Sequence, residues 1–342
     1  MDNIIDFAKL REELESVAHP MYFFHDDADG VASFLILYKF VKEGVGVPVK
    51  TQPVIDLKFA PKVRDYEPDK LFILDIANVN QDFLDEVRMP VIWVDHHEPQ
   101  DRTKVKIFNP RVKHPKMYIP ATYLCWKAVK DFDWIMIVGC LGDAYLPPEA
   151  KQFAKDHPEL ITEKEASDVG LARYESKIGK LINVFSFIIK GKVEDAKKCV
   201  KVLTKINSPE EILNQTTPEG KFIWTYYEKV NAKYLELWSH VSHMKPRDKA
   251  IVFTYTLSTY SFTGNLADDL QYKHPHTLIV IGRDASDEVR GSLRYDKGGL
   301  PKMVQEALKG IYGYGGGHDQ ACGFTVKKDD FNQFVENLKS QL

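Results

Sequence analysis

Short apolar runs separated by helix-like segments are the feature that most constrains the fold of the first half of this chain. The runs at 21–24 (MYFF), 71–74 (LFIL) and 91–94 (VIWV) are apolar throughout. Strands of a parallel sheet look like this because helices bury both of their faces. Residues 31–40 and 83–87 carry helical spacing between these runs. We therefore predict an α/β domain built on a parallel sheet.

The remainder of the chain divides into a helical segment and a second α/β segment. Between about residues 147 and 246 the pattern is helical only. Strand-like runs return after it, at 250–255, 278–281 and 288–294. The length of 342 residues allows two separate cores. We predict an N-terminal domain over 1–190, a helical connector over 191–246 and a smaller α/β domain over 247–342, with a cleft between the two domains.

Composition limits the class of protein. Lys plus Arg total 46 against 49 Asp plus Glu, a net charge of −3, which excludes a strongly basic coat but not a local basic groove. The four cysteines are widely spaced and predict buried thiols in a reducing compartment. No apolar run approaches ~20 residues, so we expect no membrane span. The acidic N-terminus resembles no secretion signal, and we expect a cytoplasmic protein.

Acidic and imidazole side chains follow the predicted strands. They are His25-Asp26-Asp27-Ala28-Asp29-Gly30, then Asp75, then Asp95-His96-His97. A fourth group is expected at Gly142-Asp143, where the apolar run 134–141 ends and is taken as a further strand. The carboxyl ends of parallel strands meet at one edge of a sheet, where ligands bind. We therefore expect these side chains to lie close together.

Clustered carboxylates repel one another unless cations neutralise them. Mixed Asp and His ligands suit Mn²⁺ or a similar divalent ion better than Ca²⁺, which prefers oxygen alone. Two ions would neutralise four aspartates and could together activate a water and bind a phosphoryl oxygen. Each motif by itself is better explained as a solvated turn, a surface His pair or a helix N-cap. Their joint placement favours a binuclear phosphoesterase centre.

These motifs resemble, in order and spacing, the four motifs of the DHH phosphoesterase superfamily. Near the C-terminus, Gly315-Gly316-Gly317-His318 followed by Ala321-Cys322-Gly323-Phe324 is similar to the GGGH signature of the DHH-associated domain, found in RecJ nucleases and oligoribonucleases. The resemblance runs from about residue 20 to residue 326 and is greatest to compact archaeal RecJ-like nucleases and stand-alone oligoribonucleases.

The resemblance implies two divalent ions, with Mn²⁺ preferred and Mg²⁺ or Co²⁺ as alternatives. The ligands of one ion would be His25, Asp27 and Asp75. Those of the other would be Asp29, Asp75, His96 and Asp143, so that Asp75 bridges the pair. His97 would face the scissile phosphate, and Asp95 would orient the imidazoles.

Substrate-binding residues are predicted mainly in the second domain. Backbone N–H groups of the glycine-rich loop Gly315-Gly316-Gly317 could approach a phosphate closely, and His318 would add a donor. Arg290, Ser292 and Arg294 lie on one face of a strand and resemble the family's phosphate-binding segment. Without that resemblance, a solvated edge strand with two arginines would explain them equally well. In the first domain, Arg111 lies in a short basic stretch that is a candidate backbone-phosphate track.

The resemblance implies a metal-dependent exonuclease that releases mononucleotides from single-stranded DNA or RNA through a water activated by two metal ions. The alternative is a nanoRNase or phosphodiesterase acting on very short RNA or on linear products of cyclic dinucleotides. A replisome or helicase accessory scaffold is disfavoured because every ligand position is filled. An active nuclease could still bind a helicase or a replication or repair protein. The oligomeric state, monomer or homodimer, stays open.

Overall fold

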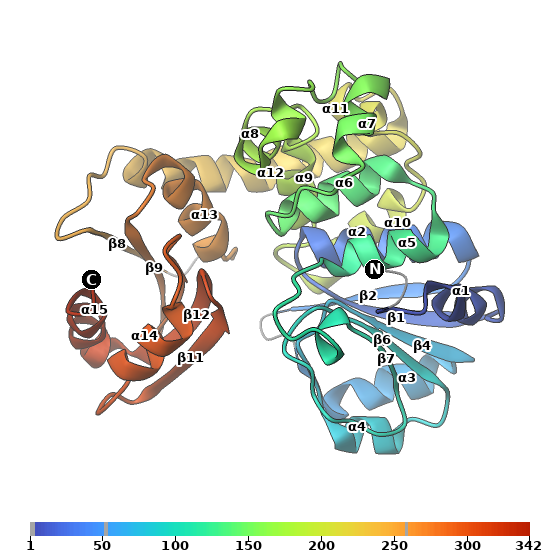
Figure 1. Cartoon of the computed structure of the whole chain (residues 1–342), viewed down its shortest axis with the longest axis horizontal. Coiled ribbons are helices and arrows are strands. Elements are labelled where there is room, and N and C mark those ends of the chain that lie inside the picture. Colours follow the sequence, from blue (N-terminus) through green and yellow to red (C-terminus); the bar gives the residue numbers. More distant parts are fainter. Residues whose placement is uncertain (1–3, 51–53, 257–258) are drawn as a thin grey trace. The chain divides into compact units, whose positions relative to one another are not determined.

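The computed structural model describes residues 4–50, 54–256 and 259–342. The chain forms two compact units, Met1–Glu228 and Lys229–Leu342 (Figure 1). In the described residues, no helix combines the length and the apolar character needed to cross a membrane.

The first unit contains a five-stranded, entirely parallel sheet (Figure 1). Its strands lie in the order β2-β1-β4-β6-β7. They are β1 Pro20–His25, β2 Val45–Val49, β4 Lys70–Leu74, β6 Val91–Val94 and β7 Lys106–Phe108. The three apolar runs are thus β1, β4 and β6, as predicted, whereas β2 and β7 were not predicted. The strand order reverses between β1 and β4, the position where doubly wound sheets bind ligands.

Successive residues of each central strand point into different cores. Phe24, Leu74 and Val94 face one core, while Phe23 and Ile73 face the other. Both cores are closed by helices, so the strands are apolar at every position. The helices around this sheet are α1 Phe7–Glu15, α2 Ala28–Val41, α3 Ala60–Tyr66, α4 Gln81–Glu86 and α5 Ala121–Val129. The first unit also contains a separate two-stranded sheet, formed by β3 Val54–Ile55 and β5 Asn78–Val79.

The apolar run 134–141 was wrongly predicted as a strand. It forms most of helix α6 (Asp133–Gly142), and all of its residues are buried. A helix enclosed on every side is apolar all round, so its sequence cannot be distinguished by periodicity from a buried strand. Asp143 therefore follows the end of a helix rather than the end of a strand.

Helices alone occupy the next part of the chain, as predicted. They are α7 Ala150–Asp156, α8 Val169–Tyr174, α9 Lys180–Ile188, α10 Val193–Leu203, α11 Pro209–Leu213 and α12 Pro218–Val241. Helix α12 begins in the first unit and ends in the second.

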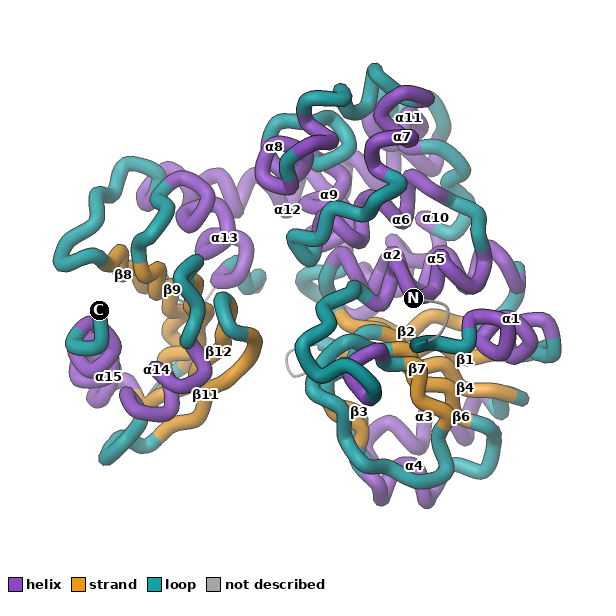
Figure 2. The backbone as a smooth tube through the Cα atoms, viewed as in Figure 1, coloured by secondary structure: helices purple, strands orange, loops and turns teal. Residues whose placement is uncertain are grey.

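The second unit is a mixed five-stranded sheet in the order β11-β12-β10-β9-β8, drawn in orange in Figure 2. Only β8 and β9 pair in parallel. The strands are β8 Ala250–Tyr255, β9 Leu278–Ala285, β10 Glu288–Arg294, β11 Gly313–His318 and β12 Ala321–Lys327. The helices are α13 Thr263–Lys273, α14 Leu300–Ala307 and α15 Phe331–Lys339. The core between the sheet, α14 and α15 includes Val280, Leu293, Phe324, Val304 and Phe334.

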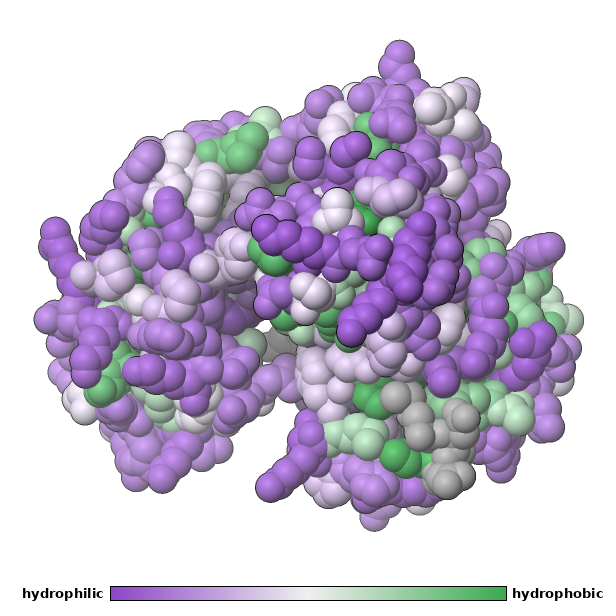
Figure 3. Space-filling model, turned by 45° about the horizontal axis from the view of Figure 1, so that its top comes forward, coloured by the Kyte–Doolittle hydropathy of each residue, from purple (hydrophilic) through white to green (hydrophobic). Residues whose placement is uncertain are grey.

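The glycine-rich segment 315–317 was predicted as a loop, and this was wrong. It belongs to the edge strand β11, which pairs with β12 along its whole length. Glycine is uncommon in strands, but pairing with β12 holds this segment in a strand conformation. On the molecular face shown in Figure 3, hydrophilic residues predominate and hydrophobic residues lie in small groups. All four cysteines are buried free thiols, as predicted.

Candidate metal centre

The first motif crosses from the end of β1 into the first turn of α2. His25 is the last residue of β1, and Asp27 caps the N-terminus of α2 with its Oδ1 accepting from the Gly30 N–H at 2.9 Å. The other carboxylate oxygen of Asp27 lies 2.7 Å from His25 Nδ1. A side chain at Gly30 would lie 2.3 Å from the His25 carbonyl oxygen, so only glycine allows the helix to start this close to the strand.

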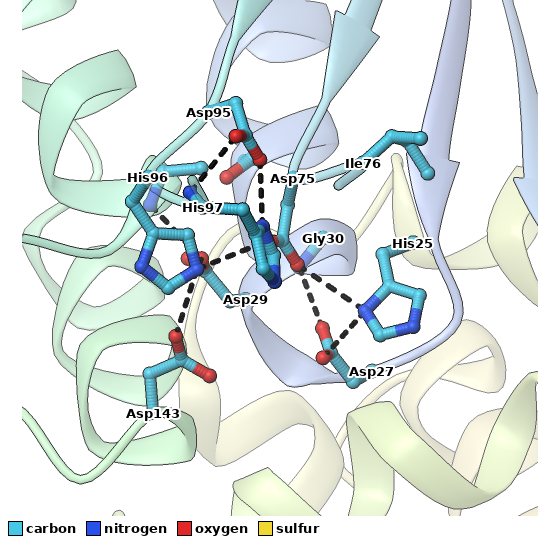
Figure 4. Close-up of polar contacts among 12 residues, drawn as sticks. His25, Asp27, Asp29, Gly30, Asp75, Ile76, Asp95, His96, His97 and Asp143 are labelled. Carbon is cyan, nitrogen blue, oxygen red and sulfur yellow. Dashed lines mark hydrogen bonds and ion pairs between the residues drawn. The ribbon is translucent and has the colours of Figure 1, made fainter. Parts of the chain in front are cut away.

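Asp75 occupies the middle of the cluster, directly after β4 (Figure 4). It is 1% exposed and its backbone is left-handed, with φ of 55°. Its Oδ2 lies 3.4 Å from His25 Nδ1, while its Oδ1 lies 3.2 Å from His96 Nε2. One carboxylate thus faces histidines from two different strand ends, as the predicted bridging role requires.

Asp29 is completely buried in the first turn of α2 and is oriented by helix α5. Its Oδ2 accepts from the Ala121 N–H at 2.9 Å and its Oδ1 from the Thr122 N–H at 2.7 Å. The positive end of the α5 dipole therefore stabilises this carboxylate. Each oxygen retains a further lone pair, and Oδ2 lies 3.9 Å from His96 Nε2.

Asp143 reaches the same imidazole from the end of α6. Its Oδ2 lies 3.3 Å from His96 Nε2. The Tyr118 hydroxyl donates to both the Oδ2 and the backbone oxygen of Asp143, each at 3.0 Å, and the Tyr118 ring contacts the His96 ring edge-on. A side chain at Gly142 would lie 2.7 Å from Ala28 Cβ, so glycine there allows α6 to end against α2.

Asp95 orients His97. Its Oδ1 lies 2.8 Å from His97 Nδ1, and its Oδ2 accepts from the His97 backbone N–H at 2.8 Å. The Asn109 amide donates to the same Oδ2 at 3.2 Å and to the His97 carbonyl oxygen at 3.0 Å. With its Nδ1 held against Asp95, His97 has its Nε2 on the opposite side of the ring.

Burial and mutual repulsion perturb the titration of this cluster. Burial, together with the Asp75 and Asp143 carboxylates, raises the pKa of Asp29 well above its usual value. Burial raises the pKa of Asp143 to about 6. Burial alone would also raise the pKa of Asp75, but the imidazoles of His25 and His96 lower it. Joint ionisation of Asp29 and Asp143 is therefore opposed within the cluster, and a bound cation would favour it.

The donor set fits divalent metal ions. Three ligand atoms, one from each of His25, Asp27 and Asp75, lie within 4.8 Å of one another, and so do three from Asp29, Asp75 and His96. His25 Nδ1 and Asp75 Oδ2 are buried and have no hydrogen-bond partner of suitable geometry within the described residues, although Nδ1 lies 2.7 Å from Asp27 Oδ2 and 3.4 Å from Asp75 Oδ2. Atoms that converge without hydrogen bonding are arranged as ligands are around an ion.

The other predicted substrate residues are divided between the two units. In the first, Arg111 donates to Glu98 at 2.7 Å and to the Pro115 carbonyl oxygen, so part of its guanidinium is already engaged. In the second unit, Ser292 contacts Thr263 on α13. The remaining predicted residues lie on β10 and on the edge strand β11: Arg290, Arg294, Gly315, Gly316, Gly317 and His318. Their contact with substrate and the predicted cleft stay predictions.

Two side chains at this centre were missed or misinterpreted from the sequence. Tyr118 carries no motif signal, because only the fold brings it to Asp143. Asn109, two residues before Arg111, was not predicted as part of the centre, yet its amide donates to Asp95 and to the His97 carbonyl oxygen.

Family models and solved structures resemble this chain. The DHH family N-terminal domain matches residues 21–129, and the DHHA1 domain matches residues 251–342. No curated protein matches the chain.

Among solved structures, RecJ from Thermus thermophilus in complex with Mn²⁺ matches with a TM-score of 0.67 at 15% identity, covering 98% of this chain and 54% of that one. This chain therefore spans about half the length of that protein. A manganese-bound exonuclease RecJ matches with a TM-score of 0.62 at 15% identity, covering 98% and 93%. A DHH domain of the S1p family of ribosomal proteins matches with a TM-score of 0.65 at 15% identity, covering 97% and 88%. The DHH model matches the predicted N-terminal domain, the DHHA1 model matches the predicted C-terminal domain, and the fold resembles that of RecJ. The chain therefore belongs to the DHH phosphoesterase superfamily.

Proposed function

We propose that this protein is a divalent-metal-dependent exonuclease that hydrolyses phosphodiester bonds of single-stranded DNA or RNA from a chain end and releases mononucleotides. The observation that carries the proposal is the position of Asp75, with its Oδ2 3.4 Å from His25 and its Oδ1 3.2 Å from His96. One carboxylate between two sets of ligands is the arrangement needed to hold two ions side by side.

The ligand sets we propose are His25, Asp27 and Asp75 for one ion, and Asp29, Asp75, His96 and Asp143 for the other. When bound, two divalent ions supply charge stabilisation for the phosphoryl group and lower the pKa of an attacking water. We favour Mn²⁺, since each set mixes imidazole with carboxylate. RecJ of Thermus thermophilus forms complexes with Mn²⁺ and with Mg²⁺, which supports either ion.

The protein's own residues orient the substrate and the protons. His97, fixed through Nδ1 by Asp95, presents Nε2 to the non-bridging oxygen of the scissile phosphate. Asp27 uses one oxygen to cap α2, so the direction of its other oxygen is set by the helix. In the second unit, Arg290, Arg294 and the β11 backbone would bind phosphates away from the bond that is cleaved.

The test is hydrolysis of 5′- and 3′-labelled DNA and RNA oligomers of increasing length, with Mn²⁺ and with EDTA. We expect mononucleotides to appear from one end with Mn²⁺ only. A strong preference for the shortest RNA would favour the nanoRNase alternative instead. If purified protein with bound Mn²⁺ hydrolyses none of these substrates, the proposed function is wrong.

A further inference from the structure

The backbone turns sharply at Asp75, and two hydrogen bonds from strand β6 hold the turn. Asp75 has a left-handed backbone with φ of 55°, a region that residues with a side chain rarely occupy. Such a conformation persists only where the surrounding structure imposes it. The Asp75 N–H donates to the Val94 carbonyl oxygen at 2.9 Å, and the Trp93 indole N–H donates to the Ile76 carbonyl oxygen at 2.9 Å. Two neighbouring residues of β6 thus hold the backbone on both sides of the Asp75 side chain.

The hydrogen bond from Trp93 lies in the interior of the first unit. Trp93 is 2% exposed, Ile76 is completely buried, and both belong to the core that also contains Phe83 of α4. Ile76 follows Asp75 at the edge of the ligand cluster (Figure 4). A buried carbonyl oxygen that loses its donor is disfavoured, because no water replaces the bond. Without the indole N–H, the turn would relax toward another backbone conformation, and the Asp75 side chain would move with it.

Strand β6 also leads into the imidazole that Asp75 faces. After Val94 the chain continues through Asp95 to His96, whose Nε2 lies 3.2 Å from Asp75 Oδ1. The same strand therefore fixes both the backbone of the carboxylate and one histidine of the second proposed ligand set. The position in which ligands are held before an ion binds sets the affinity, and the groups behind the ligands determine that position.

We propose that Trp93 is a positioning residue of the metal centre, which holds the left-handed turn so that the two oxygens of Asp75 point toward both ions. The inference rests on the proposed function, since it requires Asp75 to bind metal. It deepens that function by adding a residue of the sheet interior that is not one of the proposed ligands. Loss of the indole N–H should weaken binding of both ions, because Asp75 offers a ligand atom to both groups that could hold one.

The test removes the indole N–H and measures Mn²⁺ binding in the absence of substrate. Trp93→Phe keeps a large aromatic side chain without a donor, and in calorimetric titration it should bind both Mn²⁺ ions about tenfold more weakly than the wild type. Electron paramagnetic resonance gives a second measurement, because two Mn²⁺ ions bridged by a carboxylate are spin-coupled. With two ions per chain, the coupling should weaken in Trp93→Phe. Trp93→Met, which also lacks a donor, is measured in the same way if Trp93→Phe does not fold.

Trp134→Phe is the matched control. The Trp134 indole N–H also donates to a backbone carbonyl oxygen, that of Asn207 at 3.2 Å, and Trp134 is also buried. It lies at the start of α6, whereas Asp143 follows the other end of that helix. Trp134→Phe should lower the unfolding temperature of the metal-free protein, as Trp93→Phe does, yet keep the wild-type Mn²⁺ affinity and spin coupling.

Wild-type Mn²⁺ affinity and coupling in Trp93→Phe would overturn the inference, and so would an equal loss in Trp134→Phe. In both cases, hydrolysis of labelled oligomers by the wild-type protein would leave the proposed function intact. If Trp93→Phe weakens binding as stated but the wild-type protein hydrolyses none of the substrates, the proposed function fails and this inference stands. A wild-type protein that binds no Mn²⁺ overturns both.

Discussion

Replacing Asp75 with asparagine would test the bridging arrangement with little disturbance of the backbone. Asp75 has a left-handed conformation, with φ of 55°. Asparagine tolerates this region well, whereas alanine there would add a strain of about 1 kcal/mol. Asp75→Asn therefore removes the charge between His25 and His96 and nearly preserves shape.

The size of the effect can be worked out from the geometry. Asp75 offers a ligand atom to both groups that could hold a metal ion, so in the proposed arrangement its charge would act on both ions. At about 4 Å and an effective dielectric constant of about 20, one pair of unit charges interacts by about 4 kcal/mol. Because a divalent ion at bonding distance is attracted more strongly, we expect at least about a thousandfold loss of affinity for each ion.

The assay is calorimetric titration with Mn²⁺, accompanied by thermal unfolding with and without the ion. Wild-type protein should be stabilised by about 2.7 kcal/mol when free Mn²⁺ is about 100 times its dissociation constant. Asp75→Asn should lose this gain at the same Mn²⁺ concentration. Asp85→Asn is the matched control, because Asp85 is an exposed aspartate paired with Lys104.

The reasoning is refuted if Asp75→Asn binds two Mn²⁺ ions with wild-type affinity. Binding of one ion at full affinity would also contradict it, because the carboxylate would then belong to a single site.

Three further predictions concern Tyr118 and His96 at the centre and an ion pair at the opposite end of β4. Tyr118→Phe removes the hydrogen bond to Asp143 and should lower Mn²⁺ affinity about tenfold without changing metal-free stability; equal affinity in titration would contradict this. Lys70→Met breaks a nearly buried ion pair with Glu13 at 2.7 Å and should lower the free energy of unfolding in urea by roughly 3 kcal/mol; an unchanged midpoint would count against it. Burial opposes protonation of His96, but the facing carboxylates raise its pKa to about 10, so bound Mn²⁺ must displace a proton. Mn²⁺ affinity should therefore fall about tenfold for each pH unit lost between about pH 8 and pH 6, and a pH-independent titration would exclude this linkage.

Much of the first unit could be predicted because its strands are buried on both faces. A run of four apolar residues such as 71–74 is too short for a buried helix and is stable as a strand covered on both faces. A residue that directly follows such a strand, as Asp75 does, then lies at one edge of the sheet. Strand β2 (VGVPV) could not be predicted, because it contains glycine and proline and depends on pairing with β1.

Errors in the candidate site arose where tertiary packing decides the structure. The run before Asp143 is apolar at every position, which fits a buried helix as well as a buried strand. Its periodicity therefore could not distinguish the two structures. Segment 315–317 is a strand only because β12 pairs with it. Tyr118 reaches Asp143 across 25 residues of sequence, and nothing local signals that contact.

The two backbone hydrogen bonds from the start of helix α5 to Asp29 limit which substitutions the centre can accept. Both oxygens of this carboxylate accept hydrogen bonds from backbone N–H groups. In an asparagine, the side-chain NH₂ group would face one of these N–H donors, and that donor would lose its acceptor. A glutamate would add a methylene where the side chain has no exposed surface. We therefore expect Asp75→Asn to yield folded protein and Asp29→Asn to fail to fold, although each replaces one carboxylate with an amide.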